Sequence, residues 1–360
     1  MIITFVLQMN LPFNYDRIAE NHDIIGRRAE AELFFKSIYD RKRSVAIYGA
    51  PKSGKESFIR YSLDTLESRG LSFILCEINL FNIRTMEDFI SLFKEKMLEC
   101  YNEIHYNSIL PFEIHVDSLD ERKILNLPEI IATDAGKLII IYFKEFQNLL
   151  QCSNDQIDLE DLDKIWSKQT NVRYIFSGSF VNQMKYIFEE KKYFYFMCDV
   201  ISLEKLKKKE CVDYIVRSFQ TLGRVIQDEQ AGTIYHLADG NIWYIKHLCS
   251  ICMSMPIGYV NNNIIKKATD SLISLHTPRF MQIMMDLTPN QINFLKAVVD
   301  GVQRFSSQEI LEGYHLNSSA NVFRLKDALK KKEVLTFDKE DNAIILDTLF
   351  AYWLKNTYFQ

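Results

Sequence analysis

Residues 49–57, Gly-Ala-Pro-Lys-Ser-Gly-Lys-Glu-Ser, match the phosphate-binding pattern G-x-x-x-x-G-K. In that pattern the glycines let successive backbone N–H groups turn inward around a polyphosphate, and the lysine reaches its β and γ oxygens. The next residue is normally Ser or Thr, whose hydroxyl binds Mg²⁺, but here it is Glu56. The stretch therefore predicts nucleotide binding, while ordinary magnesium-assisted hydrolysis does not follow from it. The alternative is a glycine- and lysine-containing loop without function.

The segments on either side of this loop support a nucleotide site. Residues 44–48 form a short apolar run of the kind found in buried parallel strands. Residues 58–63, and on to about Gly70, have the apolar spacing of a helix. A strand, a glycine-bearing turn and a helix in this order point a helix N-terminus at an anion.

The rest of the first half of the chain predicts an α/β fold. Four further strands are expected, at residues 71–80, 137–143, 172–176 and 199–203, with an amphipathic helix from residue 86 to about 101. Strands that alternate with helices predict a parallel sheet with helices on both faces. Ligands of such sheets bind at the carboxyl ends of the strands.

The pattern changes after Leu203, where the chain becomes helical. A purely helical stretch is expected to about residue 275, followed by a break at residues 276–278. Helices are then expected to open at residues 288–289, 306–309 and 318–319, and residues 334–337 and 343–346 are expected to pair as a hairpin. Three short helices and a hairpin predict a winged helix-turn-helix. The expected domains are an N-terminal arm (1–23), a P-loop nucleotide-binding core (24–203), an all-α lid (204–284) and a winged-helix domain (285–360).

The composition is that of an ordinary globular chain of two or three domains. The sequence has 43 Lys and Arg and 47 Asp and Glu, a formal charge of −4, so no overall attraction to nucleic acid or to a membrane is expected. No apolar run approaches the ~20 residues of a membrane span. Seven cysteines, an odd number over a long chain, indicate a reduced, cytoplasmic protein. The C-x-x-C pair Cys249 and Cys252 is expected to be buried thiols rather than a zinc site. Met9 is a second candidate start of translation.

Five short motifs carry a family resemblance. They are Asp-Ile-Ile-Gly-Arg-Arg-Ala-Glu (23–30), Lys-Glu-Phe-Gln (144–147), Phe-Ser-Gly-Ser (176–179), Asp-Gly-Asn-Ile-Trp-Tyr (239–244) and Asp-Thr-Leu-Phe-Ala-Tyr-Trp-Leu (347–354). In this order they resemble motifs of the archaeal-type AAA+ ATPases of the STAND group, over roughly residues 10–357. The resemblance implies ATP or ADP as the ligand, with the first motif near the adenine.

The resemblance also implies roles for single residues. Residues 144–147 correspond to a Walker B motif, in which Glu145 would orient the attacking water. Ser179 would be the polar sensor residue near the γ-phosphate. The alternatives are a carboxylate at Glu145 that caps a helix, and a helix N-cap at Ser179. The expected nucleotide-binding residues are Gly26, Arg27, Gly49, Pro51, Lys52, Ser53, Gly54, Lys55, Glu56, Ser57 and Lys144.

Three positions depart from the family pattern. Glu56 replaces the hydroxyl residue, Lys144 replaces the Walker B aspartate, and Ile242 replaces a lid proline. In a working site the first two positions hold the magnesium shell together. Here they carry opposite charges, which at ~4 Å attract by about 4 kcal/mol at an effective dielectric near ~20. We therefore expect a Glu56–Lys144 ion pair where the metal would sit, ATP binding that tolerates metal removal, and slow or absent turnover.

Two alternatives to this ion pair stay open. Glu56 could coordinate Mg²⁺ itself while Lys144 points to solvent, or the site could bind nothing. Whether Mg²⁺ is bound is therefore undecided, and no set of protein metal ligands is predicted. The acidic residues between 155 and 163 are expected to form a solvated helix face.

The winged-helix domain points to a macromolecular partner. Its expected recognition helix, within residues 318–332, carries five basic residues, Arg324, Lys326, Lys330, Lys331 and Lys332, enough for a local phosphate-binding stripe. Residues 285–360 nevertheless hold nine Lys and Arg and ten Asp and Glu, so a protein partner is as well supported as DNA. The expected function is a nucleotide-dependent switch with weak or absent ATP hydrolysis. The alternative is a non-enzymatic scaffold that binds DNA or protein, and oligomers are compatible with either.

Overall fold

The computed structural model of the chain describes residues 12–19, 24–105, 120–152, 157–256 and 258–360. The predictions for Met9, Asp23 and Asp155 concern residues outside these ranges. The chain divides into two compact units. The first comprises residues 28–51 and 58–203, and the second comprises the segment up to residue 27, residues 52–57 and residues 204–360. The domain boundaries expected from the sequence stay predictions.

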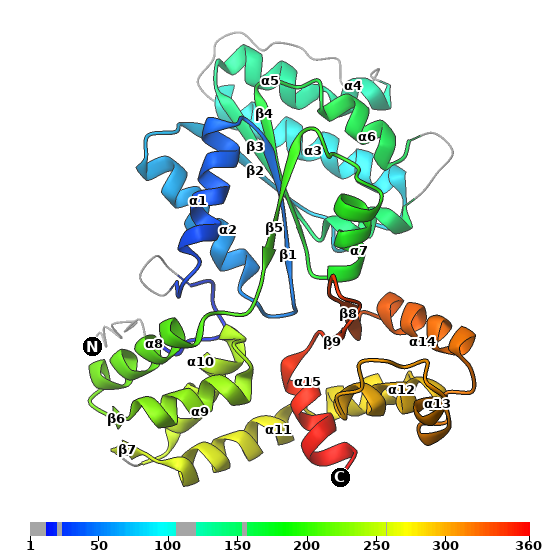
Figure 1. The fold of residues 1–360 in the computed structure, drawn as a ribbon. Helices are drawn as coiled ribbons and strands as arrows, with labels where there is room; N and C mark the ends of the chain where they lie inside the picture. The colour runs from blue at the N-terminus through cyan, green and yellow to red at the C-terminus, as the bar shows by residue number, and fades with distance from the viewer. Residues whose placement is uncertain (1–11, 20–23, 106–119, 153–156, 257) are drawn as a thin grey trace, which may run out of the picture. The chain divides into compact units, whose positions relative to one another are not determined.

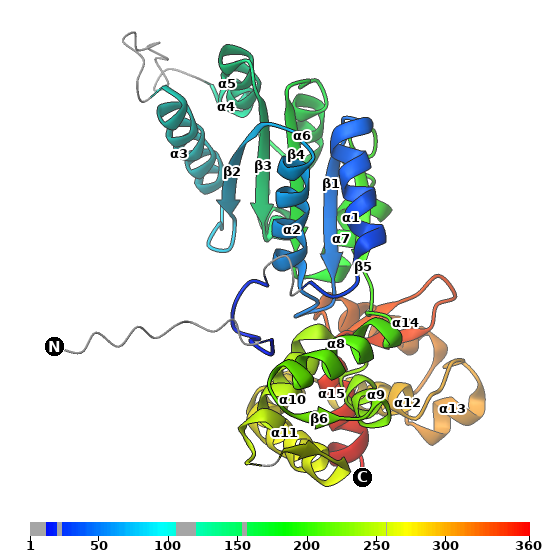
Figure 2. The same ribbon diagram turned by 90° about the vertical axis from the view of Figure 1, so that its left-hand side faces the viewer.

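The first unit is built on a five-stranded parallel sheet, which confirms the α/β fold. Its strands are β1 (Ser44–Gly49), β2 (Phe73–Asn79), β3 (Leu138–Lys144), β4 (Val172–Gly178) and β5 (Cys198–Leu203). Their order is β2-β3-β4-β1-β5, as Figure 2 shows. β1 is buried along its whole length because it lies between β4 and β5.

Helices cover both faces of this sheet (Figure 1). One face is covered by α1 (Arg28–Phe35), the π-helix η2 (Lys36–Asp40) and α2 (Lys55–Ser68). The remaining helical elements of this unit are α3 (Met86–His105), α4 (Glu121–Leu125), α5 (Leu127–Ala135), η4 (Phe146–Gln151), α6 (Leu159–Trp166), α7 (Val181–Lys185) and η5 (Tyr186–Glu190). Alternate residues of β3 point to opposite faces. Tyr142 belongs to the core beneath α1 and α2, whereas Phe143 stacks on Trp166 of α6 at 5.4 Å between ring centroids.

The helical part of the second unit begins after β5. It contains α8 (Lys208–Thr221), α9 (Asp228–Ala238), α10 (Ile242–Ser254) and α11 (Asn262–Met285), with two short parallel strands, β6 (Val225–Ile226) and β7 (Tyr259–Val260). The helical lid is confirmed, and the β6–β7 pair is an addition to the purely helical pattern that was predicted. Cys249 and Cys252 are both buried in α10.

The expected break at residues 276–278 is wrong, because α11 runs through Pro278 to Met285. The helix buries Leu272 before the proline, and Phe280 and Met284 after it. These spacings of eight and four residues keep one apolar face in the core on both sides of the proline. The Thr277 hydroxyl donates to the Ile273 carbonyl at 2.8 Å. Such a bond to the carbonyl four residues earlier is often found where a helix bends. Packing therefore outweighs the local preference of proline.

The C-terminal elements form the predicted winged helix. They are α12 (Pro289–Val299), α13 (Gln308–Gly313), α14 (Ser319–Lys331), β8 (Leu335–Phe337), β9 (Ala343–Ile345), α15 (Thr348–Trp353) and η6 (Leu354–Tyr358). Thr288 and Gln291 form a capping box ahead of α12, with Pro289 in its first turn. Ser318 caps α14 by accepting from the Asn321 N–H at 3.2 Å. β8 and β9 pair antiparallel, so the expected hairpin is confirmed.

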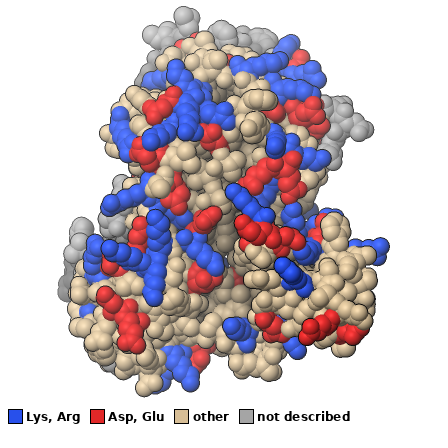
Figure 3. All heavy atoms as spheres, in the orientation of Figure 1, with Lys and Arg blue, Asp and Glu red and all other residues tan. Residues whose placement is uncertain are grey.

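The charges on the face drawn in Figure 3 match the balanced composition. Figure 3 shows basic and acidic side chains interspersed rather than gathered into a single-sign field. Across the described parts of the chain, no helix has both the length and the apolar character needed to cross a bilayer. All seven cysteines are free and buried.

Candidate nucleotide-binding site

The carboxyl ends of three neighbouring strands bring predicted site residues together in the first unit. β1 ends at Gly49, where the phosphate-binding stretch begins, while Glu145 follows β3 and Ser179 follows β4. The Ser179 hydroxyl donates to the Glu145 carboxylate, and so does the Ser179 backbone N–H at 3.3 Å. Gln147 donates to the same oxygen at 2.8 Å. The predicted catalytic carboxylate and sensor residue are therefore in direct contact.

This contact replaces the two capping roles that the sequence left open. Glu145 stands at the N-cap position of η4, but its side chain accepts no capping hydrogen bond there. The N-cap residue of α7 is Phe180, not Ser179. Both capping alternatives are therefore wrong.

The backbone around Glu145 is held in a strained conformation. Its φ is 57°, in the left-handed region, which costs a non-glycine residue on the order of 1–3 kcal/mol. Gly178 lets Gln147 approach closely, since a Cβ at this position would lie 2.4 Å from Gln147 Oε1. Strain of this kind persists only where the surroundings enforce it, and it is common at functional sites.

Lys144, at the end of β3, is paired with a carboxylate of the neighbouring strand. Its ammonium lies 3.1 Å from Glu77 of β2, which also contacts Arg60 at 2.8 Å. The alternative in which Lys144 points to solvent is therefore wrong, because its side chain is only 25% exposed. The Glu56–Lys144 pair stays a prediction, since Glu56 belongs to the other unit.

The second half of the phosphate-binding stretch has the backbone of an anion cradle. Lys52 and Gly54 are both left-handed, with φ of 63° and 84°, and α2 starts immediately afterwards at Lys55. Such turns direct N–H groups toward one point ahead of a helix N-terminus. The Ser53 hydroxyl is buried and has no hydrogen-bond partner. These features fit a bound phosphate group.

The same stretch contacts the start of α10 within the second unit. The Lys52 ammonium lies 3.3 Å from the centre of the Trp243 ring, a close cation–π contact. A Cβ on Gly54 would lie 3.4 Å from the Ile242 Cγ2 atom. Ile242 is the first residue of α10, the position at which proline is favoured in helices. The departure from a lid proline therefore leaves the helix start intact, with Asn241 as its cap.

Trp243 was missed as a site residue by the sequence analysis, which placed it in the lid motif only. It belongs to an aromatic cluster in which Tyr15 stacks on His247 at 3.9 Å and contacts Trp243 at 5.3 Å. Burial, and next the charge of Lys52, lower the pKa of His247 to about 4. Burial and the same lysine lower the pKa of His276 to about 4. Both rings are therefore neutral at pH 7, and Lys52 carries the charge of the cluster.

The charge of Lys52 changes within the pH range just above neutrality. Burial, followed by the nearby Arg279 guanidinium, lowers the pKa of Lys52 to about 8. The carboxylates of Asp347 and Asp16 oppose this shift. An ammonium with this pKa is mostly protonated at pH 7 and mostly neutral at pH 9.

Hydrogen bonds connect α10 to the winged helix. The Tyr244 hydroxyl donates to Asp347 at 2.9 Å, and Arg279 of α11 donates to that hydroxyl at 3.1 Å and to the Asp347 carboxylate. Asp347 also caps α15 by accepting from two backbone N–H groups at 3.1 Å. A continuous set of contacts therefore runs from Lys52 through the start of α10 to α15.

The remaining predicted residues lie at the base of the lid. Gly26 and Arg27 are both left-handed, each with φ of 64°. A Cβ on Gly26 would lie 2.6 Å from Glu210 Oε2, so glycine is needed for this approach of α8. Arg27 donates to the Glu204 carbonyl at 2.6 Å. The Ser57 hydroxyl accepts from the Ala19 N–H at 2.9 Å, which ties the arm to the loop. The expected adenine contacts stay predictions.

Comparisons with known proteins support the fold. A family model described as "Probable winged helix domain" matches residues 278–356. A comparison with curated proteins gives no match. The Walker-type ATPase of Pyrococcus abyssi has a similar structure, with a TM-score of 0.71 and 17% identity over 96% of this chain and 99% of that chain.

Two proteins of Aeropyrum pernix are also similar. Its ORC2 protein, solved as ADPNP-ADP complexes, has a TM-score of 0.61 and 16% identity over 96% of each chain. Its ORC1 protein, solved in complex with DNA, has a TM-score of 0.50 and 14% identity over 95% of this chain and 94% of that chain. At these identities the similarity establishes the P-loop NTPase fold with a winged-helix domain, and membership of the STAND group stays a prediction.

Proposed function

We propose that the protein binds ATP or ADP and acts as a nucleotide-dependent switch with weak or absent hydrolysis. The observation that carries this proposal is the contact of Lys52 with Trp243 at 3.3 Å. Lys52 belongs to the phosphate-binding stretch, and Trp243 to the helix that reaches Asp347 through Tyr244. A triphosphate competes with the Trp243 ring for the Lys52 ammonium, because a full negative charge attracts it more strongly than an aromatic face. Nucleotide binding would then loosen or reposition α10.

Weak hydrolysis follows from the two charged substitutions. The loop has no hydroxyl at position 56 for a magnesium shell, and Lys144 stands where a metal-binding carboxylate is expected. Bound magnesium would polarise the phosphoryl group and fix its geometry. The hydrogen bond between Ser179 and Glu145 supports a role for these two residues in orienting a water molecule.

The first test measures ATP binding with magnesium and with EDTA, using tryptophan fluorescence. Trp166 and Trp353 are 1% and 2% exposed in separate cores, so Trp243 is the tryptophan placed to report on the loop. We expect ATP to change the emission with or without the metal, and Trp243→Phe to abolish this response. Equilibrium dialysis should show that the Trp243→Phe variant still binds ATP. No binding at millimolar ATP under either condition would reject the proposal.

The second test uses the pKa of Lys52. Because its pKa is lowered to about 8, the free protein loses the ammonium between pH 7 and pH 9. A neutral amine attracts phosphate less, so the Kd for ATP should rise about tenfold over this range. Lys52→Arg should remove most of the pH dependence, because guanidinium stays charged. An equal pH dependence in that variant would assign the effect to another group.

A second candidate function, a scaffold that binds a macromolecule through α14, is favoured by one observation. Phe323 on the outer face of α14 is 74% exposed. Several of the basic residues nearby are already engaged: Lys326 pairs with Asp341, Lys331 with Asp327, and Lys332 donates to the Asp286 carbonyl. An exposed aromatic ring among partly neutralised charges favours a protein partner over DNA for this helix. Loss of partner capture in Phe323→Ala, with ATP binding intact, would support this function.

A further inference from the structure

Two loops lie side by side at the amino ends of β1 and β5, at the edge of the sheet opposite to Gly49, Glu145 and Ser179. The basic loop, residues 41–43, is Arg-Lys-Arg and leads into β1. The aromatic loop, residues 191–197, is Lys-Lys-Tyr-Phe-Tyr-Phe-Met and leads into β5. The strands pair in parallel with Ser44 opposite Cys198, and the Ser44 N–H donates to the Met197 carbonyl at 2.7 Å. The register of the sheet therefore joins the two loops into one surface.

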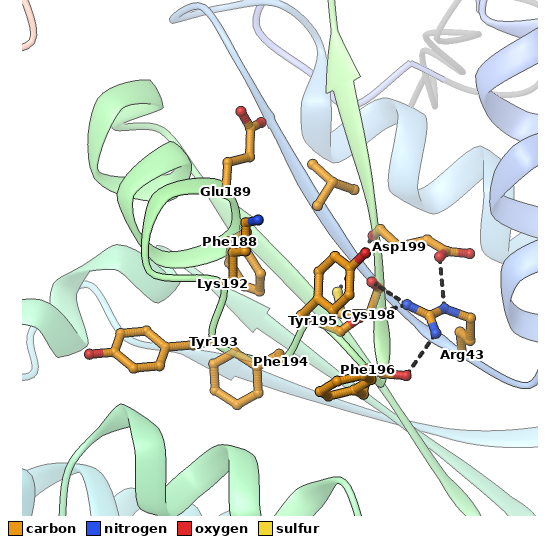
Figure 4. Close-up of a pocket in the computed structure, with 11 residues that line it drawn as sticks. Arg43, Phe188, Glu189, Lys192, Tyr193, Phe194, Tyr195, Phe196, Cys198 and Asp199 are labelled. Carbon is orange, nitrogen blue, oxygen red and sulfur yellow. Dashed lines mark hydrogen bonds and ion pairs between the residues drawn. The ribbon is translucent and has the colours of Figure 1, made fainter.

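Arg43 fixes the backbone of the aromatic loop (Figure 4). Its guanidinium donates to the carbonyls of Phe196 at 2.7 Å, Tyr195 at 2.9 Å and Cys198 at 2.7 Å. Asp199 accepts from Arg43 Nε at 2.7 Å and so orients the guanidinium. One side chain thus holds three carbonyl groups within residues 195–198 in place.

The loop is also held in an unusual backbone conformation. Lys192 and Phe194 have φ of 58° and 64°, a region that non-glycine residues rarely adopt. Phe194 is completely buried and packs against Phe176 at 5.1 Å, so it anchors the loop. Two left-handed residues in one short loop mean that the surrounding structure enforces this shape.

The fixed loop holds two aromatic rings in solvent instead of burying them. Tyr195 is 58% exposed and Phe196 is 85% exposed, and the two rings meet edge to face at 5.4 Å. Beside them lies a cavity of about 510 Å³, whose lining includes Phe188, Glu189 and Lys192. A cavity of this size is within the range of ligand-binding sites. Exposed aromatic rings on a rigid support are typical of binding surfaces, because little conformational entropy is lost on contact.

We propose that this surface binds single-stranded nucleic acid, with bases stacked on Tyr195 and Phe196 and phosphates held by Lys191, Lys192 and Lys42 of the basic loop. Every base has a flat face that stacks on an aromatic ring, and lysines beside the rings attract the phosphate backbone. Lys192 lies 5.8 Å from the Tyr195 ring and Lys191 lies 5.6 Å from the Tyr186 ring. A duplex keeps its base faces stacked on each other, so flat exposed rings favour a single strand.

The charges around the rings agree with an anionic ligand. Five carboxylates lie in or beside these loops: Asp40, Asp163, Glu189, Glu190 and Asp199, and Asp163 accepts from the Phe194 backbone N–H. Asp199 is engaged by Arg41 at 3.1 Å and by Arg43, and Glu189 is engaged by the Tyr48 hydroxyl. The charge of Asp199 is therefore compensated by two guanidinium groups, and Glu189 is hydrogen-bonded. Lys191 and Lys192 are exposed next to the rings, where a strand would pass.

The experiment measures fluorescence anisotropy of a labelled oligothymidine with the full chain at low salt. Phe196→Ala and Tyr195→Ala should each raise the Kd about tenfold, because each removes a stacking platform. Lys191→Gln combined with Lys192→Gln should reduce the slope of log K against log salt by up to about 1.4, which corresponds to two phosphate contacts on a single strand. All four side chains are exposed, so the fold should be unaffected; thermal melts check this.

Two matched controls make the result specific. Phe81 is 69% exposed in the same unit and follows the carboxyl end of β2, the outermost strand on the side of the sheet away from β5. The Phe81→Ala variant should therefore bind the oligonucleotide like the wild type. Phe323→Ala tests the winged helix instead, and a loss confined to that variant would overturn the proposal. Absence of wild-type binding at low salt would also overturn it. A third outcome would overturn it as well: Phe196→Ala changes self-association in sedimentation but leaves oligonucleotide binding unchanged. That result would identify a second copy of the chain as the occupant.

Discussion

Glu56→Thr combined with Lys144→Asp should raise magnesium-dependent ATP turnover by at least about 100-fold over the wild type. The two changes restore a hydroxyl and a carboxylate at the positions that hold the magnesium shell in P-loop NTPases. Electrostatic stabilisation of the transferred phosphoryl group by metal and arginine is worth several orders of magnitude. Glu145 and Ser179 are already in contact, so the two residues proposed to act on the attacking water need no change. Phosphate release with Mg²⁺ and with EDTA measures the effect.

The ion pair of Lys144 determines how this experiment must be designed. The Lys144 ammonium lies 3.1 Å from Glu77, so Lys144→Asp removes this cation and puts a second carboxylate on the neighbouring strand, leaving Arg60 at 2.8 Å from Glu77. Two nearby like charges repel, which disfavours the charged form of the new aspartate and its binding to the metal. A third change, Glu77→Gln, removes the repulsion and should give the larger gain. If Glu77→Gln left the turnover of the Glu56→Thr, Lys144→Asp variant unchanged, Glu77 would have no influence on hydrolysis.

The control for this prediction is Glu145→Gln in the activated background. It keeps the shape of the side chain and removes the carboxylate that accepts from Ser179. Turnover should return to the wild-type rate, while ATP affinity should stay within a few-fold. Wild-type turnover of about 1 s⁻¹ or faster with Mg²⁺, in the range of ordinary enzymes, would contradict the idea that the two substitutions impair hydrolysis.

The fold was largely predictable because its signals are local. Each strand of the sheet is a short apolar run, and each helix of the winged domain begins at a recognisable cap such as Thr288 or Ser318. The continuity of α11 through Pro278 was not predictable from local preference. It depends on Phe280 and Met284 packing into a core whose other members lie far away in the sequence.

The candidate site was predictable only where a motif names its residues. Glu145 and Ser179 follow strands that are neighbours in the sheet, so their contact follows once the strand order is known. The partner of Lys144 could not be predicted, because nothing in the sequence says that β2 pairs with β3 in the register that brings Glu77 close. The Lys52–Trp243 contact could not be predicted from the sequence either, because the two residues lie 191 positions apart.

The second large effect concerns Asp347, where Asp347→Ala should destabilise the second unit by about 3 kcal/mol. It removes the cap of α15, worth about 1 kcal/mol, and it leaves the buried Tyr244 hydroxyl without its acceptor, which costs about 1–3 kcal/mol. The loss of the Arg279 ion pair adds little because that side chain is 42% exposed. Urea unfolding followed by circular dichroism measures the change.

Asp347→Asn separates the structural role of this residue from its place between α10 and α15. Asparagine can still cap the helix and accept from Tyr244, so it should cost only about 1 kcal/mol. Tyr244→Phe removes only the hydroxyl. The free energy of unfolding lost in the double variant Tyr244→Phe, Asp347→Ala should be smaller than the sum of the two single losses by about 0.5–3 kcal/mol, the range expected for groups in direct contact. Additive effects would mean that Tyr244 and Asp347 act independently. In that case the contacts between Trp243 and the winged helix could not transmit nucleotide binding, because α10 and α15 would be energetically separate despite their 2.9 Å hydrogen bond.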